Sequence, residues 1–477
     1  MSSKIFRSAA LLALMLALAA CEVGPDYQAP DTALAPFHNA AAVDARTAAA
    51  APPLDRWWTG FDDPVLDGLI QRALDQNLDL SASLGRVQQA RAAAQAAGAQ
   101  LLPTVDATGQ ASAQHQSLNS PLGEIGKQFP GYNRNQRVYD VGAVASWEID
   151  LAGGLRRGEE AADAEAEAAD AELAGTRITV AADVADAYFQ IRGDQARIAV
   201  TQQQIEVDTH LLDLVHQRRS RGLGDDREVS QAEAVLEQAQ AAMPPLRIAL
   251  EAQLNRLDVL LGNQPGTEAA ALAGTVELPA LPAIPETDTP TDFLRRRPDI
   301  IAAERKLAAA NARIGVALAD YYPKLSLSGV LGFDSLSANH LFTAASFEPA
   351  ATGAIQWRIF DFGKVDAEVK QAEGSNAEAL AQYRSTVLKA AQDVEDAFVT
   401  LTQTELRTTQ LQDEVRSLGR SRDLSQQAYA AGSIPLTDVL DADRQLLATR
   451  DDLAQNKADA ARAAVRSFRA LGGGWSS

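Results

Sequence analysis

The sequence predicts a mainly α-helical fold that also contains two small β-hairpins and is built from two copies of one structural unit. Three observations lead to this fold class. The tracts 155–219 and 365–430 contain no proline and are rich in Ala, Gln, Glu, Asp, Arg and Leu, a composition typical of long packed helices. Short segments before each tract alternate apolar and polar residues, as strands do. Several motifs also recur at a constant spacing.

The chain of 477 residues begins with a predicted signal peptide, residues 1–20. Two basic residues precede an apolar run that is too short to span a bilayer comfortably. The run ends in Leu-Ala-Ala-Cys, which resembles the bacterial lipoprotein box, where the thiol becomes the lipid attachment point. We therefore expect a covalent lipid on Cys21, the only cysteine, and no other cofactor. An ordinary secretory signal that ends in a chance cysteine is the alternative.

Composition excludes several classes of function. The net charge of −20 argues against nucleic acid and anionic lipid surfaces as partners. No stretch of 18 consecutive apolar residues follows the signal, so we expect no helical membrane span there. The five histidines are scattered, and His210 and His216 lack the i, i+4 spacing of a helical metal site. Because no P-loop, nucleophile elbow or HExxH motif is present either, we expect neither an enzyme nor a structural metal site.

The two halves of the chain repeat one another. The matched segments are SWEIDLAGG (146–154) with QWRIFDFGK (356–364), DVADAYF (183–189) with DVEDAFV (393–399), and RGLGDDREVSQAEA (221–234) with AGSIPLTDVLDADR (431–444). All three pairs share an offset of 210 residues, whereas LLPTVDATG (101–109) and YYPKLSLSG (321–329) differ by 220. A constant spacing indicates duplication. The first copy therefore carries about ten extra residues between Pro103 and Trp147.

Each repeat begins with a helical stretch, at 67–99 and 297–318, followed by segments that alternate in polarity. In 325–333, 139–149 and 351–359 the odd positions are mostly apolar and the even positions mostly polar or small. This alternation predicts strands with one apolar and one polar face. Polar loops at 115–138 and 335–350 then read as hairpin connections, giving β-hairpins at about 104–150 and about 324–360.

A long helix follows each hairpin, and at 1.5 Å per residue such a helix reaches roughly 100 Å. No globular domain needs such a length, so we expect these helices to pack in coiled-coil fashion. Tip turns at about 220–228 and about 431–436 lead into return helices at about 228–262 and 436–470.

The predicted organisation places these repeats between extended segments. The parts are a signal peptide (1–20), an N-terminal extended segment (21–66), the first repeat (67–262), a Pro-rich linker (263–296), the second repeat (297–470) and a C-terminal tail (471–477). Four strands cannot close a membrane barrel, because open edges in hydrocarbon leave backbone groups unpaired. If the strands cross a membrane, several copies must pool them. A small soluble sheet beside a coiled coil is the alternative.

Several motifs resemble the TolC-like outer-membrane factors, and more narrowly the OprM/NodT-type lipoproteins of tripartite efflux systems. These motifs are GPDYQAP (24–30), WW (57–58), RRRPDIIAAERKLAAANARIG (295–315), YYPKLSLSG (321–329) and DVLDADRQLL (438–447), together with the signal and Cys21. The resemblance implies a homotrimer with a 12-stranded outer-membrane β-barrel continued by a periplasmic α-helical barrel. It also implies that the N-terminal segment, the linker and the tail form a belt around that barrel.

The function implied by this resemblance is a passive exit duct for small molecules in the bacterial outer membrane, lipid-anchored and membrane-spanning. Its partners would be a periplasmic adaptor protein and an inner-membrane pump of the resistance-nodulation-division type. The exit duct of a type I protein-secretion system is an alternative. A structural lipoprotein that tethers the envelope is another, but it predicts continuous heptads, and the alternating segments argue against it.

The resemblance also implies functional residues near the tip turns. Asp438 and Asp441 match the acidic constriction of the periplasmic entrance, and their i, i+3 spacing places them on one helical face. Three copies would form a ring that favours cations and that divalent ions plug. A solvated acidic face is the alternative. Tyr429 and Glu228 match the latch of a closed entrance, whereas Ile434 stands where the family pattern has Arg, which implies a weaker latch.

The turns themselves are expected to contact the adaptor. The residues are Gly222, Leu223, Gly224, Gly432, Ser433 and Ile434. Tip-to-tip contact needs small residues and exposed backbone. Glycines that merely permit a tight turn are the alternative, and the two roles are compatible.

Overall fold

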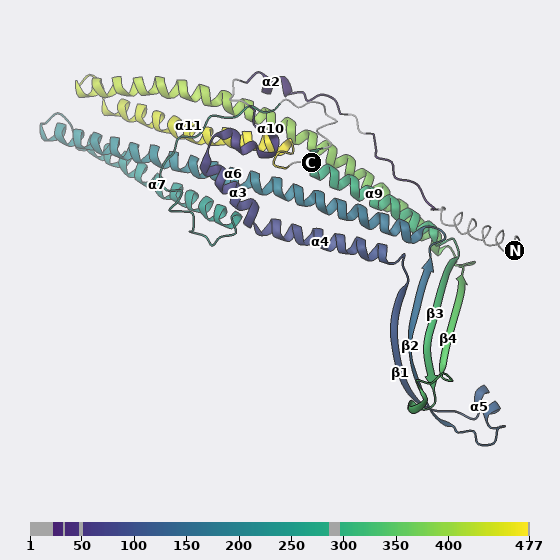
Figure 1. The fold of residues 1–477 in the computed structure, drawn as a ribbon. Helices are drawn as coiled ribbons and strands as arrows, with labels where there is room; N and C mark the ends of the chain where they lie inside the picture. Colours follow the sequence, from purple (N-terminus) through teal and green to yellow (C-terminus); the bar gives the residue numbers. More distant parts are fainter. Residues whose placement is uncertain (1–21, 32–33, 47–50, 286–295, 476–477) are drawn as a thin grey trace. The chain divides into compact units, whose positions relative to one another are not determined.

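The computed structural model describes residues 22–31, 34–46, 51–285 and 296–475 (Figure 1). The helices are α2 (Ala40–Asp44), α3 (Pro64–Gln76), α4 (Leu78–Ala99), α5 (Pro121–Gly126), α6 (Gly154–Ser220), α7 (Asp226–Leu260), α9 (Pro298–Ala319), α10 (Lys364–Ala430) and α11 (Leu436–Ala470), with short 3₁₀ helices at Leu54–Phe61 and Ala338–His340. The strands are β1 (Thr104–His115), β2 (Asn135–Ile149), β3 (Lys324–Ser335) and β4 (Phe347–Gln356). The signal and Cys21 lie outside the described residues.

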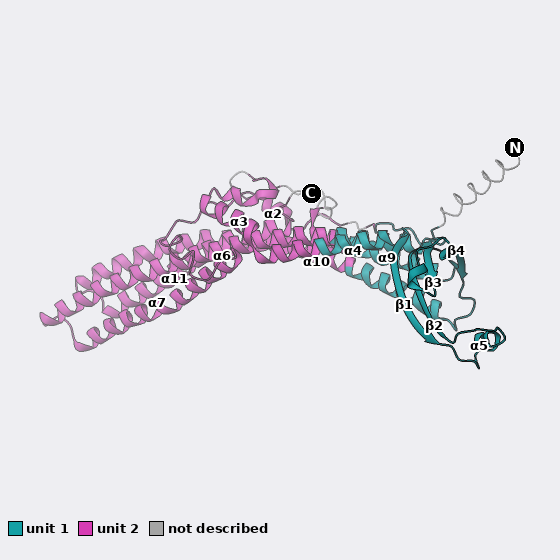
Figure 2. Ribbon diagram, turned by 60° about the horizontal axis from the view of Figure 1, so that its bottom comes forward, with its two compact units in different colours: residues 1–30, 88–168, 304–382 teal, residues 31–87, 169–303, 383–477 magenta. Residues whose placement is uncertain are grey.

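The chain forms two compact units (Figure 2). Unit 1 comprises residues 1–30, 88–168 and 304–382, and it contains all four strands named above. Unit 2 comprises residues 31–87, 169–303 and 383–477, and it contains α7, α11 and the greater part of α6 and α10. Among the residues that the structure describes, no helix is long and apolar enough to cross a bilayer.

The sheet of unit 1 is antiparallel with the order β1-β2-β3-β4. Trp147 pairs with Leu327, and Leu325 pairs with both Ile149 and Ile355. Because directly paired residues share a face, this register gathers the apolar odd positions of the central strands on one side. The opposite face includes the row Ser146, Ser328 and Thr352. The sheet therefore has one apolar and one polar face.

Strand β4 ends earlier than the alternation predicts. We expected the strand to continue to Ile359, but it stops at Gln356, which pairs with Lys324 at the start of β3. Pro323 precedes β3 and has no N–H to donate to a neighbouring strand. The residues that follow Gln356 therefore have no partner in β3 for further backbone hydrogen bonds. Trp357 instead donates its indole N–H to the Tyr321 carbonyl at 2.9 Å.

The first helical stretch is also divided, into α3 and α4, where we expected one helix. Asn77 adopts an extended backbone between them and caps α4, because its Oδ1 accepts the N–H groups of Asp79 and Leu80. Its Nδ2 donates to the carbonyl of Leu260 at the end of α7 at 2.8 Å. Asn77 therefore links the start of α4 to the end of α7.

The duplication is visible in the backbone and in single contacts. Positive-φ glycines recur 210 residues apart, in the pairs Gly153 and Gly363, Gly222 and Gly432, and Gly262 and Gly472. Trp147 donates to the carbonyl of Leu101 at 2.8 Å, just as Trp357 donates to that of Tyr321. In the second repeat, Arg297 takes the place of Asn77 by donating to the Ala470 carbonyl at the end of α11 at 2.8 Å. The two halves therefore share one architecture.

The N-terminal segment packs against the long helices of unit 2. Trp57 is fully buried and stacks on Phe468 with ring centroids 5.4 Å apart. Arg46 forms an ion pair with Glu405 of α10 at 2.6 Å. The linker makes a similar contact, because Gln195 of α6 donates to the carbonyl of Leu272 at 2.6 Å. Both extended segments therefore cover helices of this unit.

Candidate functional site at the helix tips

Two turns connect the long helices to the return helices at one end of unit 2 (Figure 1). An apolar cluster from four helices lies directly behind them and consists of Leu211, Val215, Val229, Ala232, Tyr429, Leu436, Val439 and Leu440. Since the cluster takes residues from α6, α7, α10 and α11, it holds the two turns beside each other.

Both turns have the same backbone geometry. Gly222 N–H donates to the Arg219 carbonyl and Leu223 N–H to the Arg218 carbonyl, each at 2.9 Å. The equivalent bonds run from Gly432 and Ser433 to residues 429 and 428. This is the Schellman motif, which places a left-handed residue after the helix. The φ angles of +72° and +74° and the open space around both Cα atoms show that backbone conformation, not crowding, requires glycine.

The six residues expected to contact the adaptor are not equally accessible. Gly222, Leu223, Gly432 and Ser433 are exposed, with Leu223 at 63%. Gly224 is half-buried, and a Cβ there would meet the Glu228 carboxylate. Ile434 is half-buried and packs against the apolar cluster. The accessible tip surface is therefore smaller than the sequence pattern indicates.

The structure brings Tyr429 and Glu228 together. Tyr429 Oη lies 3.5 Å from Glu228 Oε2, which is long for an O–H···O hydrogen bond. The ring of Tyr429 is 1% exposed. Burial, and after it the Glu228 carboxylate, raises the pKa of Tyr429. The phenol therefore remains protonated and can donate to the carboxylate.

Arg218 also contacts Tyr429, and the sequence analysis did not predict this contact. Its guanidinium carbon lies 4.5 Å from the centre of the Tyr429 ring, and its Nη1 donates to the Tyr429 carbonyl at 3.2 Å. A guanidinium at this distance from an aromatic ring makes a favourable cation–π contact. The resemblance implied an arginine at 434, but here the cation comes from α6. Nothing in the run HQRRSRG distinguishes Arg218 from its basic neighbours.

Asp438 and Asp441 both lie on the exposed side of α11, while Val439 and Leu440 between them are buried. Asp438 is in the first turn of the helix. Asp441 lies 3.3 Å from Arg444 in a pair that is mostly exposed. Both carboxylates are therefore accessible to solvent or ions on one face of the helix.

A third aspartate of this segment is buried. Asp443 is 2% exposed, and its Oδ1 lies 3.7 Å from Arg422 Nε. Burial raises the pKa of Asp443 to about 6, because the attraction of Arg422 is offset by Asp208, which is also buried. Asp441 and Asp443 are two positions apart, and a helix places such residues on different faces. That spacing is the signal by which the sequence distinguishes the two.

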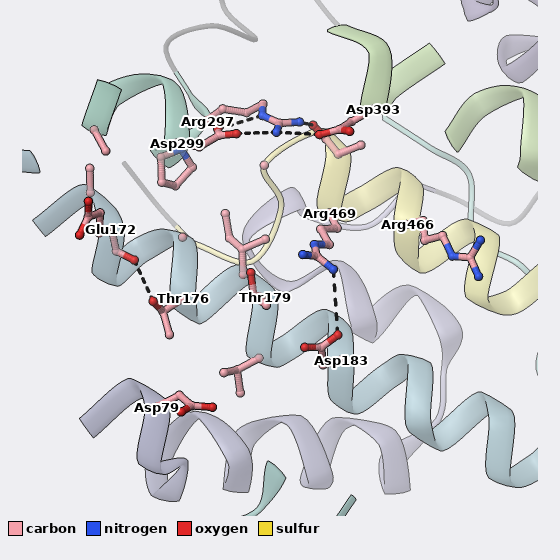
Figure 3. Close-up of a pocket in the computed structure, with 18 of the residues that line it drawn as sticks. Asp79, Glu172, Thr176, Thr179, Asp183, Arg297, Asp299, Asp393, Arg466 and Arg469 are labelled. Carbon is pink, nitrogen blue, oxygen red and sulfur yellow. Dashed lines mark hydrogen bonds and ion pairs between the residues drawn. The ribbon is translucent and has the colours of Figure 1, made fainter. Parts of the chain in front are cut away.

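A cavity of about 840 Å³ lies elsewhere in unit 2, among α4, α6, α9, α10 and α11 (Figure 3). Arg297 pairs there with Asp299 at 2.6 Å and with Asp393 at 3.1 Å, and Arg469 lies 4.0 Å from Asp183. Arg297 also binds the end of α11. Arg297, the last residue of the RRR motif (295–297), is therefore a buried structural residue. Among the described residues, no group of three or more His, Cys, Asp or Glu is placed to hold a metal ion.

The fold is that of an outer-membrane channel. The structure resembles the outer-membrane channel OprN, with a TM-score of 0.87, 33% identity, and coverage of 95% of this chain and 100% of that chain. It also resembles the open state of the MtrE channel of Neisseria gonorrhoeae, with a TM-score of 0.83, 27% identity, and coverage of 95% and 99%.

Sequence comparisons agree. The family model described as outer membrane efflux protein matches residues 69–263 and 289–473. A pyoverdine export outer membrane protein of Pseudomonas putida is 33% identical over 473 residues, covering 98% of both chains. A solvent efflux pump outer membrane protein, also of P. putida, is 30% identical over 476 residues, covering 99% of both. The chain belongs to the outer membrane efflux protein family, and it is the outer-membrane channel of an efflux system.

Proposed function

We propose that three copies of this chain form the exit duct of a tripartite efflux system that passes small molecules outward without chemical change. The sheet carries this proposal, because its register produces one apolar and one polar face. Each of its two hairpins is also followed in the chain by a helix of 67 residues. An apolar face suits lipid and a polar face suits a water-filled lumen. Three four-stranded sheets would supply 12 strands.

The proposed partners are a periplasmic adaptor and an inner-membrane pump of the resistance-nodulation-division type. Names of relatives that refer to efflux pumps support a pump partner, and the exposed tip residues Leu223 and Ser433 supply a surface for the adaptor. The names of relatives refer to pyoverdine export and to solvent and toluene efflux, which favours small organic cargo over secreted proteins. A lipid on Cys21 would supply a second membrane anchor.

We also propose that the helix tips form the gate. Asp438 and Asp441 of three copies would bring six carboxylates to one constriction, where cations concentrate and divalent ions bind. Tyr429, Glu228 and Arg218 would hold the resting entrance closed through three contacts: a long hydrogen bond, a cation–π contact and a hydrogen bond from Arg218 to the Tyr429 carbonyl. Adaptor and pump would then open it.

Conductance in planar bilayers tests the duct and its constriction together. Purified protein should form cation-selective channels that divalent ions block. Asp438→Ala with Asp441→Ala should reduce both properties while trimers persist on unheated gels. The matched control is Glu233→Ala with Glu237→Ala, which removes two exposed carboxylates from α7. Absence of channels would contradict the duct, and unchanged selectivity and block in the first variant would remove the constriction from α11.

A further inference from the structure

Exposed apolar side chains occupy the short segment that joins β4 to α10 (Figure 1). Ile359, Phe360 and Phe362 are 83%, 78% and 91% exposed, and they lie beyond Gln356, the last paired residue of the sheet. The rings of Phe360 and Phe362, which we name the aromatic pair, contact each other edge to face with centroids 4.5 Å apart. A contiguous apolar patch of this kind marks a site of interaction.

Phe362 also has an unfavourable backbone conformation. Its φ angle is +57°, in the left-handed region that bulky residues rarely adopt. The Asp361 carboxylate holds this turn, because it accepts the backbone N–H groups of Gly363 and Val365, each at 3.0 Å. Glycine at position 362 would adopt the same turn without strain. A phenylalanine placed here at a conformational cost indicates that its ring has a role.

The first repeat has a different arrangement at the equivalent place. Phe360 and Phe362 correspond, 210 positions away, to Asp150 and Ala152. Both of these residues are half-buried, and the Ala152 carbonyl accepts the backbone N–H of Val23 at 3.1 Å. The N-terminal segment therefore covers the junction of sheet and helix in the first repeat, whereas the junction in the second repeat is open.

The covering segment leads directly to the proposed lipid. Glu22 packs on Gly153, where an added Cβ would lie 2.7 Å from the Glu22 side chain. Because Cys21 directly precedes Glu22 in the chain, a lipid on Cys21 would leave the chain beside this junction. Gly153 and Gly363 are equivalent and have φ angles of +79° and +83°. The aromatic pair therefore lies at the level of the lipid along the axis of the proposed barrel.

We propose that Phe360 and Phe362 insert into the phospholipid leaflet on the periplasmic side of the outer membrane. They would anchor the second repeat at the level where a lipid on Cys21 anchors the first. Aromatic side chains that lie at this depth bury their rings at the boundary between headgroups and acyl chains. The inference rests on the proposed barrel, which places the sheet in the membrane, and it concerns residues that lie outside the strands.

The surroundings of the aromatic pair favour lipid as its partner. The apolar face of the sheet reaches this point through the exposed side chain of Ile355, which directly precedes the end of β4. Two exposed basic residues, Arg358 and Lys364, flank the pair. Their contacts with Asp320 at 3.4 Å and Glu368 at 3.6 Å are partly exposed and therefore weak. Both cations can thus also bind lipid phosphates.

Photocrosslinking in cells identifies what covers the aromatic pair. Phe362→p-benzoylphenylalanine keeps an aromatic ring, and irradiation should yield phospholipid adducts of the monomer, detected by mass spectrometry. The same substitution at Leu327, on the apolar face of the sheet, should also capture lipid, whereas at Ser328, on the polar face, it should not.

Each other outcome of this experiment has a definite meaning. Covalent dimers from position 362 would show that a neighbouring copy covers the pair, and adducts with outer-leaflet glycolipid alone would place the pair on the wrong side. Lipid adducts at Leu327 but not at Phe362 would show that the pair does not reach the membrane. All three would overturn the proposal. Absence of lipid adducts at Leu327 would instead contradict the proposed barrel.

Exchange between the repeats tests the anchoring role. Phe360→Asp with Phe362→Ala gives the second repeat the residues of the first. Alone, this variant should still form outer-membrane trimers, but with Cys21→Ala it should lower their yield several-fold below that of Cys21→Ala alone. Density-gradient fractionation with unheated gels measures this yield. Phe360→Leu with Phe362→Leu, also combined with Cys21→Ala, is the control and should retain the yield, because leucine also partitions into lipid. Equal yields of the two combined variants would overturn the anchoring role.

Discussion

Asp443 illustrates how one residue can acquire properties that its neighbours lack. It belongs to the same acidic segment as Asp438 and Asp441, but the helix turns its carboxyl inward, toward Arg422 and Asp208. Burial penalises the charged form, and the attraction of Arg422 at 3.7 Å and of Arg450 does not offset that penalty. The carboxyl therefore holds its proton to a higher pH than an exposed aspartate does.

This burial predicts a pH-dependent contribution to stability. The pKa of Asp443 rises from an ordinary 3.8 to about 6 in the folded protein, so the folded state binds the proton more tightly than the unfolded state. Stability therefore falls as pH rises from about 4 to about 6, and the full penalty, about 2–3 kcal/mol, persists above that range. Asp443→Asn should melt at a higher temperature than wild type at pH 7 and at the same temperature near pH 4.

The exposed neighbour supplies the control for this measurement. Asp441→Asn makes the same change at an exposed carboxyl of the same helix, and it is therefore the matched control for the substitution itself. In Asp443→Asn the new side-chain amide still offers Arg422 an oxygen acceptor, so the variant does not leave the guanidinium without one. A melting temperature of Asp443→Asn that falls below wild type at pH 7 would show that the charge pair with Arg422 outweighs burial.

At the scale of elements, the two tip turns combine a backbone requirement with the proposed adaptor contact. A Cβ at Gly222 meets nothing within 4 Å, so substitution there disturbs φ alone. Asn tolerates the left-handed region better than Val does. Gly222→Asn and Gly222→Val should both leave trimers intact and abolish efflux, because each adds a side chain where the adaptor must approach.

Susceptibility of cells to exported compounds, measured beside unheated gels, separates the two roles of the turn. Efflux that survives Gly222→Asn but not Gly222→Val would assign the glycine to the backbone turn only. Loss of trimers in either variant would contradict the open space around this position. Gly432→Asn provides the same comparison in the second repeat, where the φ angle is nearly equal.

Periodicity predicted the elements well where one local pattern governs them. The long helices and the return helices follow from proline-free tracts and from glycines, and their ends agree with the structure to within about two residues. Periodicity did not predict the end of β4 or the break at Asn77, because each depends on a partner distant in sequence. For β4 this partner is Pro323 beside β3, and for Asn77 it is the carbonyl of Leu260. Arg218 was missed for the same reason, since only tertiary packing places it on Tyr429.

At the scale of the whole molecule, the proposed barrel and the proposed lipid are two separate means of membrane attachment. Twelve pooled strands would bury far more apolar surface than one lipidated terminus, since a single acyl chain gives only marginal binding. Cys21→Ala behind an ordinary cleavable signal should therefore still yield trimers in the outer membrane. Density-gradient fractionation of membranes, with unheated gels, measures this. Soluble periplasmic monomers would show that the lipid is the dominant anchor.

The pairing of β2 with β3 has a consequence for the order of folding. Trp147 and Leu327 lie side by side in the sheet but 180 residues apart in the chain. The hairpin of β1 and β2 can close as soon as it is made, whereas its joining to β3 must wait until α6, α7 and the linker exist. Contacts of such long range slow folding and leave strand edges exposed meanwhile. We therefore expect the newly exported chain to expose the unpaired edge of β2 until β3 joins it, and to need chaperones that cover this edge before it reaches the membrane.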